Sequence, residues 1–158
     1  MHPSPSRQAA FSAALILLAR AWRRRVDEAV APLGLSEATA WALVRIHRSG
    51  GGVRQSTVAE ALGIEGPSLV RLLDQLCAAG LVERRGDPAD RRAKTVSLTD
   101  AGTALADTLE TVLQGVRREL LAGVSAADLD ACLRVFRTVG STLGIPTLPD
   151  TATPEQAS

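Results

Sequence analysis

Arginine dominates the residues of this sequence that could bind another molecule. Of its 18 basic residues only Lys94 is a lysine, and the planar guanidinium of arginine is well matched to phosphate and carboxylate groups. Five basic residues cluster between positions 84 and 94: Arg84, Arg85, Arg91, Arg92 and Lys94. Arginine usage that merely follows a genome's base composition is an alternative, but this density predicts a local anion-binding surface.

A second polar group lies upstream of the arginines. Ser68, Arg71 and Gln75 are spaced i, i+3 and i+7, so on a helix they share the face opposite a row of leucines. Serine can bond a phosphate or a base edge, and arginine matches guanine O6 and N7 in a major groove. A solvated polar face would look the same, so this hypothesis depends on the elements around the helix.

Catalytic and metal chemistry have no comparable pattern. The chain has no nucleophile–base pair and no phosphate-binding glycine loop, and its only histidines are His2 and His47. Cys77 and Cys132 lie far apart without a C-x-x-C pairing, and we expect both to be small buried packing residues. His47 is expected to meet the carbonyl groups at the end of its helix. We therefore expect no enzyme, metal site or cofactor.

Length and composition predict one folded domain. The 158 residues are 46% hydrophobic and 22% charged, with a net charge of +1 that gives no global field for steering onto nucleic acid. The longest apolar run, residues 13–19, is far short of the roughly 20 residues that span a bilayer. It continues in helical register through Arg23, so a signal peptide is not favoured and a cytoplasmic protein is expected.

The elements around the polar groups predict a winged helix-turn-helix. A short helix over 55–62 closes at Gly63, and a second begins with Pro67 and runs to Gly80. Strand-like segments at 81–85 and 94–98 then enclose a polar loop over 86–92. A hairpin directly after a helical hairpin is typical of a winged helix, and we assign this DNA-binding lobe to residues 35–99.

Long amphipathic helices flank the lobe. Apolar residues recur from Phe11 until Pro32, and Ser36 starts a helix that continues to Ile46. Thr99 is expected to cap a helix with the stripe Leu105, Leu109, Val112, Val116 and Leu120, and Ser125 to start a last helix with Leu129, Leu133, Phe136, Val139 and Leu143 inward. The fold class is mainly α (α+β), with a flexible N-terminus 1–8, dimerisation helices 9–34 and 100–144, and a largely disordered tail 145–158.

The apolar stripes are more than the lobe can cover. The economical solution is an obligate homodimer in which the three outer helices interleave. An intramolecular bundle is the alternative.

The helix-turn-helix and the wing that follows it resemble the MarR family of bacterial transcription regulators, in particular its SlyA branch. The similarity lies in Ala61-Leu-Gly-Ile-Glu-Gly-Pro-Ser-Leu-Val-Arg-Leu-Leu-Asp-Gln-Leu76, Gly80-Leu-Val-Glu-Arg84 and Asp87-Pro-Ala-Asp-Arg-Arg-Ala-Lys-Thr-Val-Ser-Leu-Thr99. It covers roughly residues 9–143 and implies DNA contacts by Arg71 on the recognition helix and by Arg84, Arg91 and Lys94 on the wing, with Asp90 as wing support. Our full predicted DNA-binding set is Gln55, Ser56, Pro67, Ser68, Arg71, Gln75, Arg84, Arg91, Arg92 and Lys94.

The resemblance also implies a ligand pocket, often for aromatic carboxylates. Arg20, Trp22 and Arg23 match an R-x-W-R pattern of the SlyA branch, and a cation beside an aromatic ring could hold such an anion. Trp41 is one position away from the usual aromatic residue, with Ala40 in that place, so the ligand class does not carry over directly. Solvated arginines and core-packed tryptophans are the alternative roles.

The predicted function is a ligand-responsive repressor that binds a pseudo-palindromic operator as a homodimer. The alternatives are a winged-helix protein-interaction module without sequence-specific DNA binding and a cysteine-based redox-sensing regulator. The operator, the regulated genes and the sign of regulation stay open.

Overall fold

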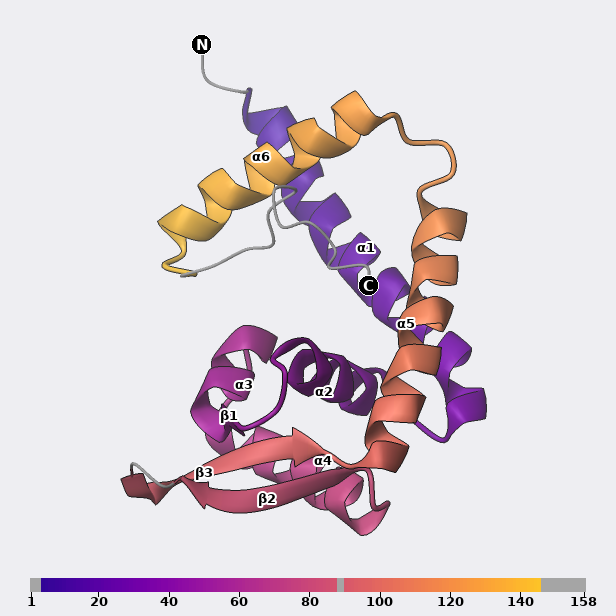
Figure 1. The fold of residues 1–158 in the computed structure, drawn as a ribbon. Helices are drawn as coiled ribbons and strands as arrows, with labels where there is room; N and C mark the ends of the chain where they lie inside the picture. The colour runs from indigo at the N-terminus through magenta and orange to yellow at the C-terminus, as the bar shows by residue number, and fades with distance from the viewer. Residues whose placement is uncertain (1–3, 88–89, 146–158) are drawn as a thin grey trace. The chain divides into compact units, whose positions relative to one another are not determined.

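The computed structural model describes residues 4–87 and 90–145, and the side chains of Arg91 and Arg92 lie outside this description. Within the chain, residues 1–117 and 118–158 form two compact units (Figure 1). The predicted tail, apart from Ile145, and the first three residues of the predicted flexible N-terminus lie outside the described residues.

Helix α1, Pro5–Val30, begins at Pro5 and not at Phe11. A proline suits the first turn of a helix because its φ is already helical and the N–H it lacks would have no partner there. The helix thus includes the last residues of the segment expected to be flexible. A short 3-10 turn, Ala31–Leu33, and Gly34 at φ 73° then redirect the chain.

Helices α2 (Glu37–Arg48), α3 (Gln55–Leu62) and α4 (Gly66–Ala78) agree with the predicted elements. Ser36 caps α2 by accepting from the Thr39 N–H, and Thr39 Oγ1 accepts from the Ser36 N–H at 2.9 Å. Gly63 closes α3 at φ 63°, a left-handed conformation that glycine adopts without strain. The helix-turn-helix is confirmed.

The sheet is larger than predicted. Strands β1 (Val53–Arg54), β2 (Val82–Asp87) and β3 (Asp90–Leu98) pair antiparallel in the order β1-β3-β2. We predicted a loop over 86–92, but β2 continues to Asp87 and β3 begins at Asp90, with a register shift at Gly86/Asp87. The prediction was therefore wrong for residues 86–87 and 90–92. A solvated antiparallel ribbon can present charged side chains, so their polarity did not require a loop. The strand β1 was missed because two residues have no alternation to recognise.

One hydrophobic core joins the lobe to α5, Asp100–Leu120. Thr99 caps α5, since its Oγ1 accepts from the Gly102 N–H at 3.0 Å and donates to the Gly80 carbonyl at 2.7 Å. The stripe that α5 buries includes Leu109 at 0% and Val116 at 3% exposure, packed with residues of α1, α2 and α4. The assignment of this stripe to a dimer interface was therefore wrong for its buried residues.

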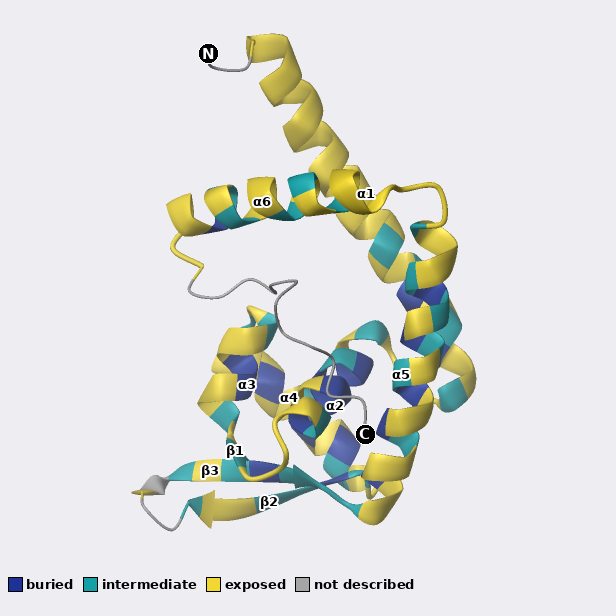
Figure 2. Cartoon of the chain, turned by 45° about the horizontal axis from the view of Figure 1, so that its top comes forward, coloured by how far each residue is buried: buried dark blue, intermediate teal, exposed yellow. Residues whose placement is uncertain are grey.

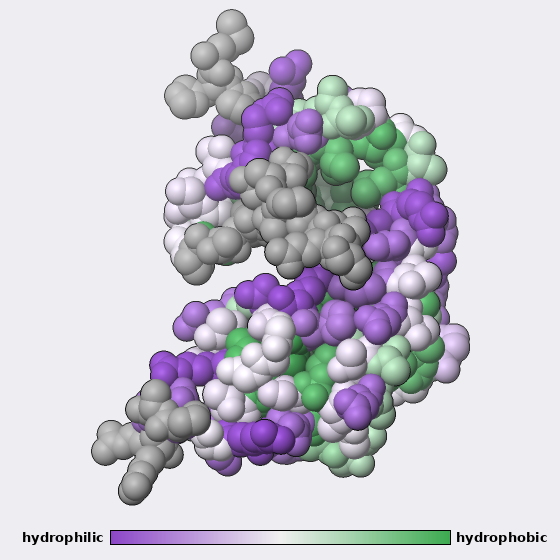
Figure 3. Space-filling model, in the orientation of Figure 1, coloured by the Kyte–Doolittle hydropathy of each residue, from purple (hydrophilic) through white to green (hydrophobic). Residues whose placement is uncertain are grey.

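Helix α6, Ala126–Thr142, lies in the second unit. Ser125 caps it by accepting from the Asp128 N–H, as predicted. Its hydrophobic side chains stay accessible, with Phe136 at 40% exposure and Val135 at 46%. Figure 2 shows α6 and the first half of α1 as mostly exposed, and in Figure 3 hydrophobic side chains gather around the α5–α6 link. No helix among residues 4–87 and 90–145 is long and apolar enough to cross a membrane.

Candidate nucleic-acid interface

Helix α4 presents the predicted reading face to solvent. Its opposite face inserts Leu69, Leu73 and Leu76 into the core at 1%, 0% and 1% exposure. This anchoring fixes the rotation of the helix about its axis, because leucines at i, i+4 and i+7 lie on one side. The residues predicted to contact DNA from this helix are all exposed: Pro67, Ser68, Arg71 and Gln75.

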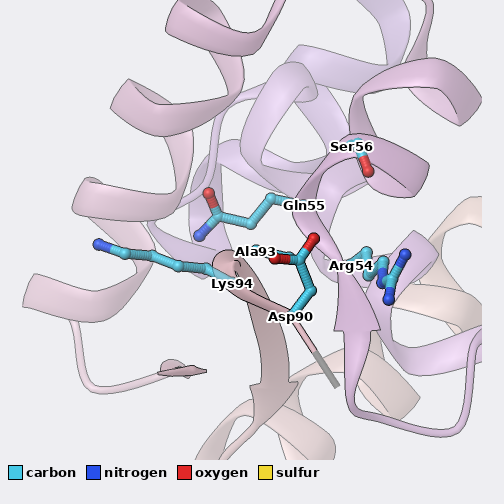
Figure 4. Close-up of a pocket in the computed structure, with 6 residues that line it drawn as sticks. All are labelled: Arg54, Gln55, Ser56, Asp90, Ala93 and Lys94. Carbon is cyan, nitrogen blue, oxygen red and sulfur yellow. The ribbon is translucent and has the colours of Figure 1, made fainter. Parts of the chain in front are cut away.

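The start of α3 faces the first residues of β3 across a hollow of about 460 Å³. Its lining residues come from β1, α3 and β3: Arg54, Gln55, Ser56, Asp90, Ala93 and Lys94. Figure 4 shows the Asp90 carboxylate turned toward Gln55 and Arg54, while Lys94 extends away from Asp90. Gln55 Nε2 is buried without a hydrogen-bond partner among the described residues. The hollow thus brings together four predicted site residues from distant parts of the sequence.

An ion pair that the sequence analysis missed ties β1 to the wing. Arg54 Nε donates to Asp87 Oδ2 at 2.8 Å, and the Asp87 side chain is only 9% exposed. Lys94 is exposed on β3, as a phosphate ligand would be. The backbones of Arg91 and Arg92 belong to β3, but their predicted contacts depend on side chains outside the described residues.

Arg84 points into the lobe. Its Nη1 donates to Asp74 Oδ1 at 2.7 Å and its Nη2 to the Val70 carbonyl at 2.9 Å, both on α4. The side chain is 21% exposed, in contrast to the open contact that the sequence predicted. The alternation of the strand could have predicted this inward orientation. Arg84 lies two residues after the buried Val82, so both side chains point to the same face.

The end of α2 is joined to α5 by two charged contacts. Arg48 binds Glu110 through both carboxylate oxygens, with Nε–Oε1 at 2.6 Å and Nη2–Oε2 at 2.9 Å. The hydrogen bonds from Arg48 hold the pKa of Glu110 below its ordinary value; burial opposes this shift, and the charges of Arg48, Arg117 and His47 favour it. His47 Nε2 lies 3.3 Å from Asp107 Oδ1, so its side chain pairs with α5 and not with helix-end carbonyls as expected.

The predicted ligand residues lie elsewhere in the first unit. Trp22 and Trp41 are partly buried and pack against the core, whereas Arg20 and Arg23 are exposed. None of these four residues lines the hollow beside the wing.

The two cysteines differ from each other in exposure. Cys77 is partly buried, as expected, but Cys132 is exposed, so the prediction that it is buried was wrong. Within residues 4–87 and 90–145, no cluster of three His, Cys, Asp or Glu side chains could hold a metal ion.

Comparison with known proteins finds the same architecture in regulators. The model of the MarR family matches residues 33–93. The crystal structure of transcriptional regulator PA3341 is 34% identical, with a TM-score of 0.78, over 85% of this chain and 98% of that protein.

Two further structures share the fold at lower identity. CouR from Rhodococcus jostii RHA1, bound to p-coumaroyl-CoA, is 24% identical over 86% of this chain and 92% of its own, with a TM-score of 0.70. A mutant MarR from E. coli, in complex with operator DNA, is 22% identical over 87% and 99%, with a TM-score of 0.76. From the family match, the relative at 34% identity and the winged-helix lobe between long helices, we conclude that this chain belongs to the MarR family of winged-helix transcriptional regulators.

Proposed function

We propose that this chain is a ligand-responsive repressor that binds a pseudo-palindromic operator as a homodimer. The observation that supports this most strongly is the exposed polar face of α4, with Ser68, Arg71 and Gln75 next to a basic wing. A rigid helix with a free polar face suits base reading in a major groove, and the wing suits contacts to the backbone or minor groove. The E. coli MarR complex with operator DNA has the same fold and supports this use of it.

The homodimer follows from the exposed apolar residues. Leu17 and Leu18 on α1 are 65% and 67% exposed, and Phe136 on α6 is 40% exposed. Exposing this much apolar surface is costly in water, and a second copy of the chain is the simplest cover for it. Two recognition helices would then meet half-sites about 34 Å apart, one turn of DNA.

The effector class rests on the first helix. We infer a small aromatic carboxylate held by Arg20, Trp22 and Arg23, the motif by which the sequence resembles the SlyA branch. The two arginines are exposed and therefore accessible to an anion, and Trp22, which lies between them in the sequence, is partly buried. CouR, a structural neighbour, is bound to p-coumaroyl-CoA, an aromatic acyl compound. A regulator of this kind acts in the cytoplasm, where its operator is.

The decisive experiment isolates the DNA that the protein prefers. Genomic fragments retained by the protein are sequenced and footprinted, and we expect protection of two inverted half-sites about one helical turn apart. Affinity should fall steeply with salt, since phosphate contacts release counterions. Binding to DNA without any sequence preference would contradict the proposal and favour the protein-interaction module.

The effector is tested on the same protein. Titration with benzoate-like acids, followed by tryptophan fluorescence, should show saturable binding that weakens when Arg20 and Arg23 are both replaced by alanine. By reciprocity the bound acid should lower operator affinity by the same factor by which operator DNA lowers affinity for the acid. Equal binding in the double variant would place the pocket elsewhere.

A further inference from the structure

We propose that Arg84 is a positioning residue for the recognition helix α4 and does not itself contact DNA. The proposal rests on the proposed DNA binding and assigns this arginine a role different from the wing contact that its sequence motif implies. Arg84 would set the position of the turn that contains Arg71, and so determine how well Arg71 reaches its base.

The guanidinium fork of Arg84 makes two hydrogen bonds to one turn of α4. The two terminal nitrogens of Arg84 bond the Val70 carbonyl at 2.9 Å and the Asp74 carboxylate at 2.7 Å. Val70 and Asp74 are four residues apart, so they lie one above the other on the same side of α4. Arg71 is the residue directly after Val70. Arg84 therefore holds both ends of the turn from which Arg71 projects.

The burial of Arg84 supports an inward role. Its side chain is 21% exposed, and Nε is buried without a partner in the part of the chain that the structure describes. The strand partner of Arg84 across the wing is Val96, which is fully buried. To reach a phosphate, Arg84 would have to leave both of its α4 partners, and charge-assisted bonds of this kind are among the stronger ones in proteins.

A link between β2 and α4 would couple the two parts of the proposed interface. The wing and the recognition helix have to contact the same duplex at once, and small misplacements of a base-reading side chain lose bidentate geometry. The buried leucines of α4 fix the rotation of the helix about its axis. The Arg84 fork holds the side of α4 that faces the wing. Arg71 is exposed and has no such contact with the described residues, so its position depends on how Arg84 holds α4.

A positioning role of Arg84 and a direct contact of Arg84 with DNA predict opposite effects of removing the negative charge of Asp74. Replacing Asp74 by asparagine removes a negative charge and frees Arg84, so a direct phosphate role predicts equal or tighter DNA binding. A positioning role predicts weaker specific binding, because the fork loses one of its two partners. The Asp74 side chain is 61% exposed, so this variant is expected to fold.

The experiment measures binding of the full chain to two probes over a range of salt concentrations. One probe is a duplex selected by the wild-type protein from a random-sequence pool, and the other is poly(dI-dC). The variants are Asp74→Asn, Arg84→Gln, Arg71→Ala and the double variant Asp74→Asn with Arg71→Ala. Glu60→Gln is the matched control, since it removes one carboxylate from the exposed surface of α3. Thermal melting of each variant checks that the lobe is folded.

We expect Asp74→Asn and Arg84→Gln each to weaken the selected duplex by about tenfold, the range of a bond to a charged group. Poly(dI-dC) binding and the salt slope should stay unchanged, and Glu60→Gln should not weaken the selected duplex. In the Arg71→Ala background, Asp74→Asn should have little further effect, because the fork acts through Arg71. A merely structural role would not produce this dependence on Arg71.

Three results would overturn the proposal. The first is a decrease of about 0.9 in the salt slope for Arg84→Gln, the signature of a lost phosphate contact. The second is unchanged or tighter binding of the selected duplex by Asp74→Asn. The third is an effect of Asp74→Asn that is equally large without Arg71. If the wild-type protein selects no duplex at all, the proposed function itself fails and the role of Arg84 falls with it.

Discussion

The winged-helix lobe and the outer helices differ in how they cover their hydrophobic side chains. The lobe buries its leucines and valines within the chain, together with Leu109 and Leu113 of α5. The first half of α1 and most of α6 leave theirs accessible, including Leu17 at 65% and Phe136 at 40% exposure (Figure 2). One region is thus complete as a fold, whereas the other, in our proposal, is completed by a second copy of the chain. Stability and assembly should therefore respond to different substitutions.

The largest expected effect breaks the lobe at its junction with α5. A Cβ at Gly102 would clash with the carbonyl oxygen of Leu81, which is backbone and cannot rotate away. We expect Gly102→Ala to cost about 3 kcal/mol or more in the free energy of unfolding, measured by urea denaturation.

Gly115→Ala is the control for this substitution. Gly115 lies in the same helix, but a Cβ added there would meet no other side chain or distant backbone within 4 Å, so alanine should stabilise the protein by about 0.5–1 kcal/mol. Equal stability of Gly102→Ala and wild type would show that the junction tolerates a side chain.

The second effect breaks assembly and leaves the lobe folded. Phe136→Asp places a charge on the exposed apolar side of α6 and should cost the dimer about 3–5 kcal/mol. Sedimentation should then show monomers whose lobe still melts cooperatively. Thr138→Asp, on the opposite side of α6, should remain dimeric. Leu109→Asp is unsuitable for this purpose, because Leu109 is 0% exposed and its replacement would unfold the lobe.

The third effect distinguishes two parts of the lobe surface, the exposed face of α4 and the wing. Arg71→Ala should cost about 1–3 kcal/mol on the selected duplex and relax the sequence preference at one position. Lys94→Ala should weaken all sequences alike and reduce the salt slope by about one. Fluorescence anisotropy over a salt series distinguishes the two. The same loss of slope in both variants would contradict the division between base reading by α4 and phosphate binding by the wing.

The smallest effect concerns the ion pair between α2 and α5. Arg48 lowers the pKa of Glu110 in the folded protein below the ordinary value of 4.5. The ion pair therefore stabilises the fold fully above pH 4.5, and this stabilisation is lost as the pH falls through the lowered pKa. Glu110→Gln should therefore reduce stability by about 0.5–1 kcal/mol at neutral pH and by nothing below the lowered pKa. Urea titrations at several pH values measure this difference; a pH-independent difference would rule out ionisation as its origin.

The elements of this protein were predictable where their signals are local. Ser36, Thr99 and Ser125 cap helices by bonding backbone N–H groups three residues away, and Gly63 ends a helix by its own φ. The exposed face of α4 was predictable for the same reason, since its leucines and its polar residues alternate with the period of one helix. Each of these features depends on residues within one or two turns.

The partners of the charged side chains were not predictable in this way. Arg84 meets Asp74 across 10 residues, Arg54 meets Asp87 across 33 and Arg48 meets Glu110 across 62. An arginine has the same composition and local pattern whether it faces solvent, DNA or a carboxylate of its own chain. Periodicity therefore identified the helices and their apolar sides. The packing of distant elements decided that Arg84 faces α4 and that Leu109 lies in the core, because burial and ion pairing depend on which surfaces meet in space.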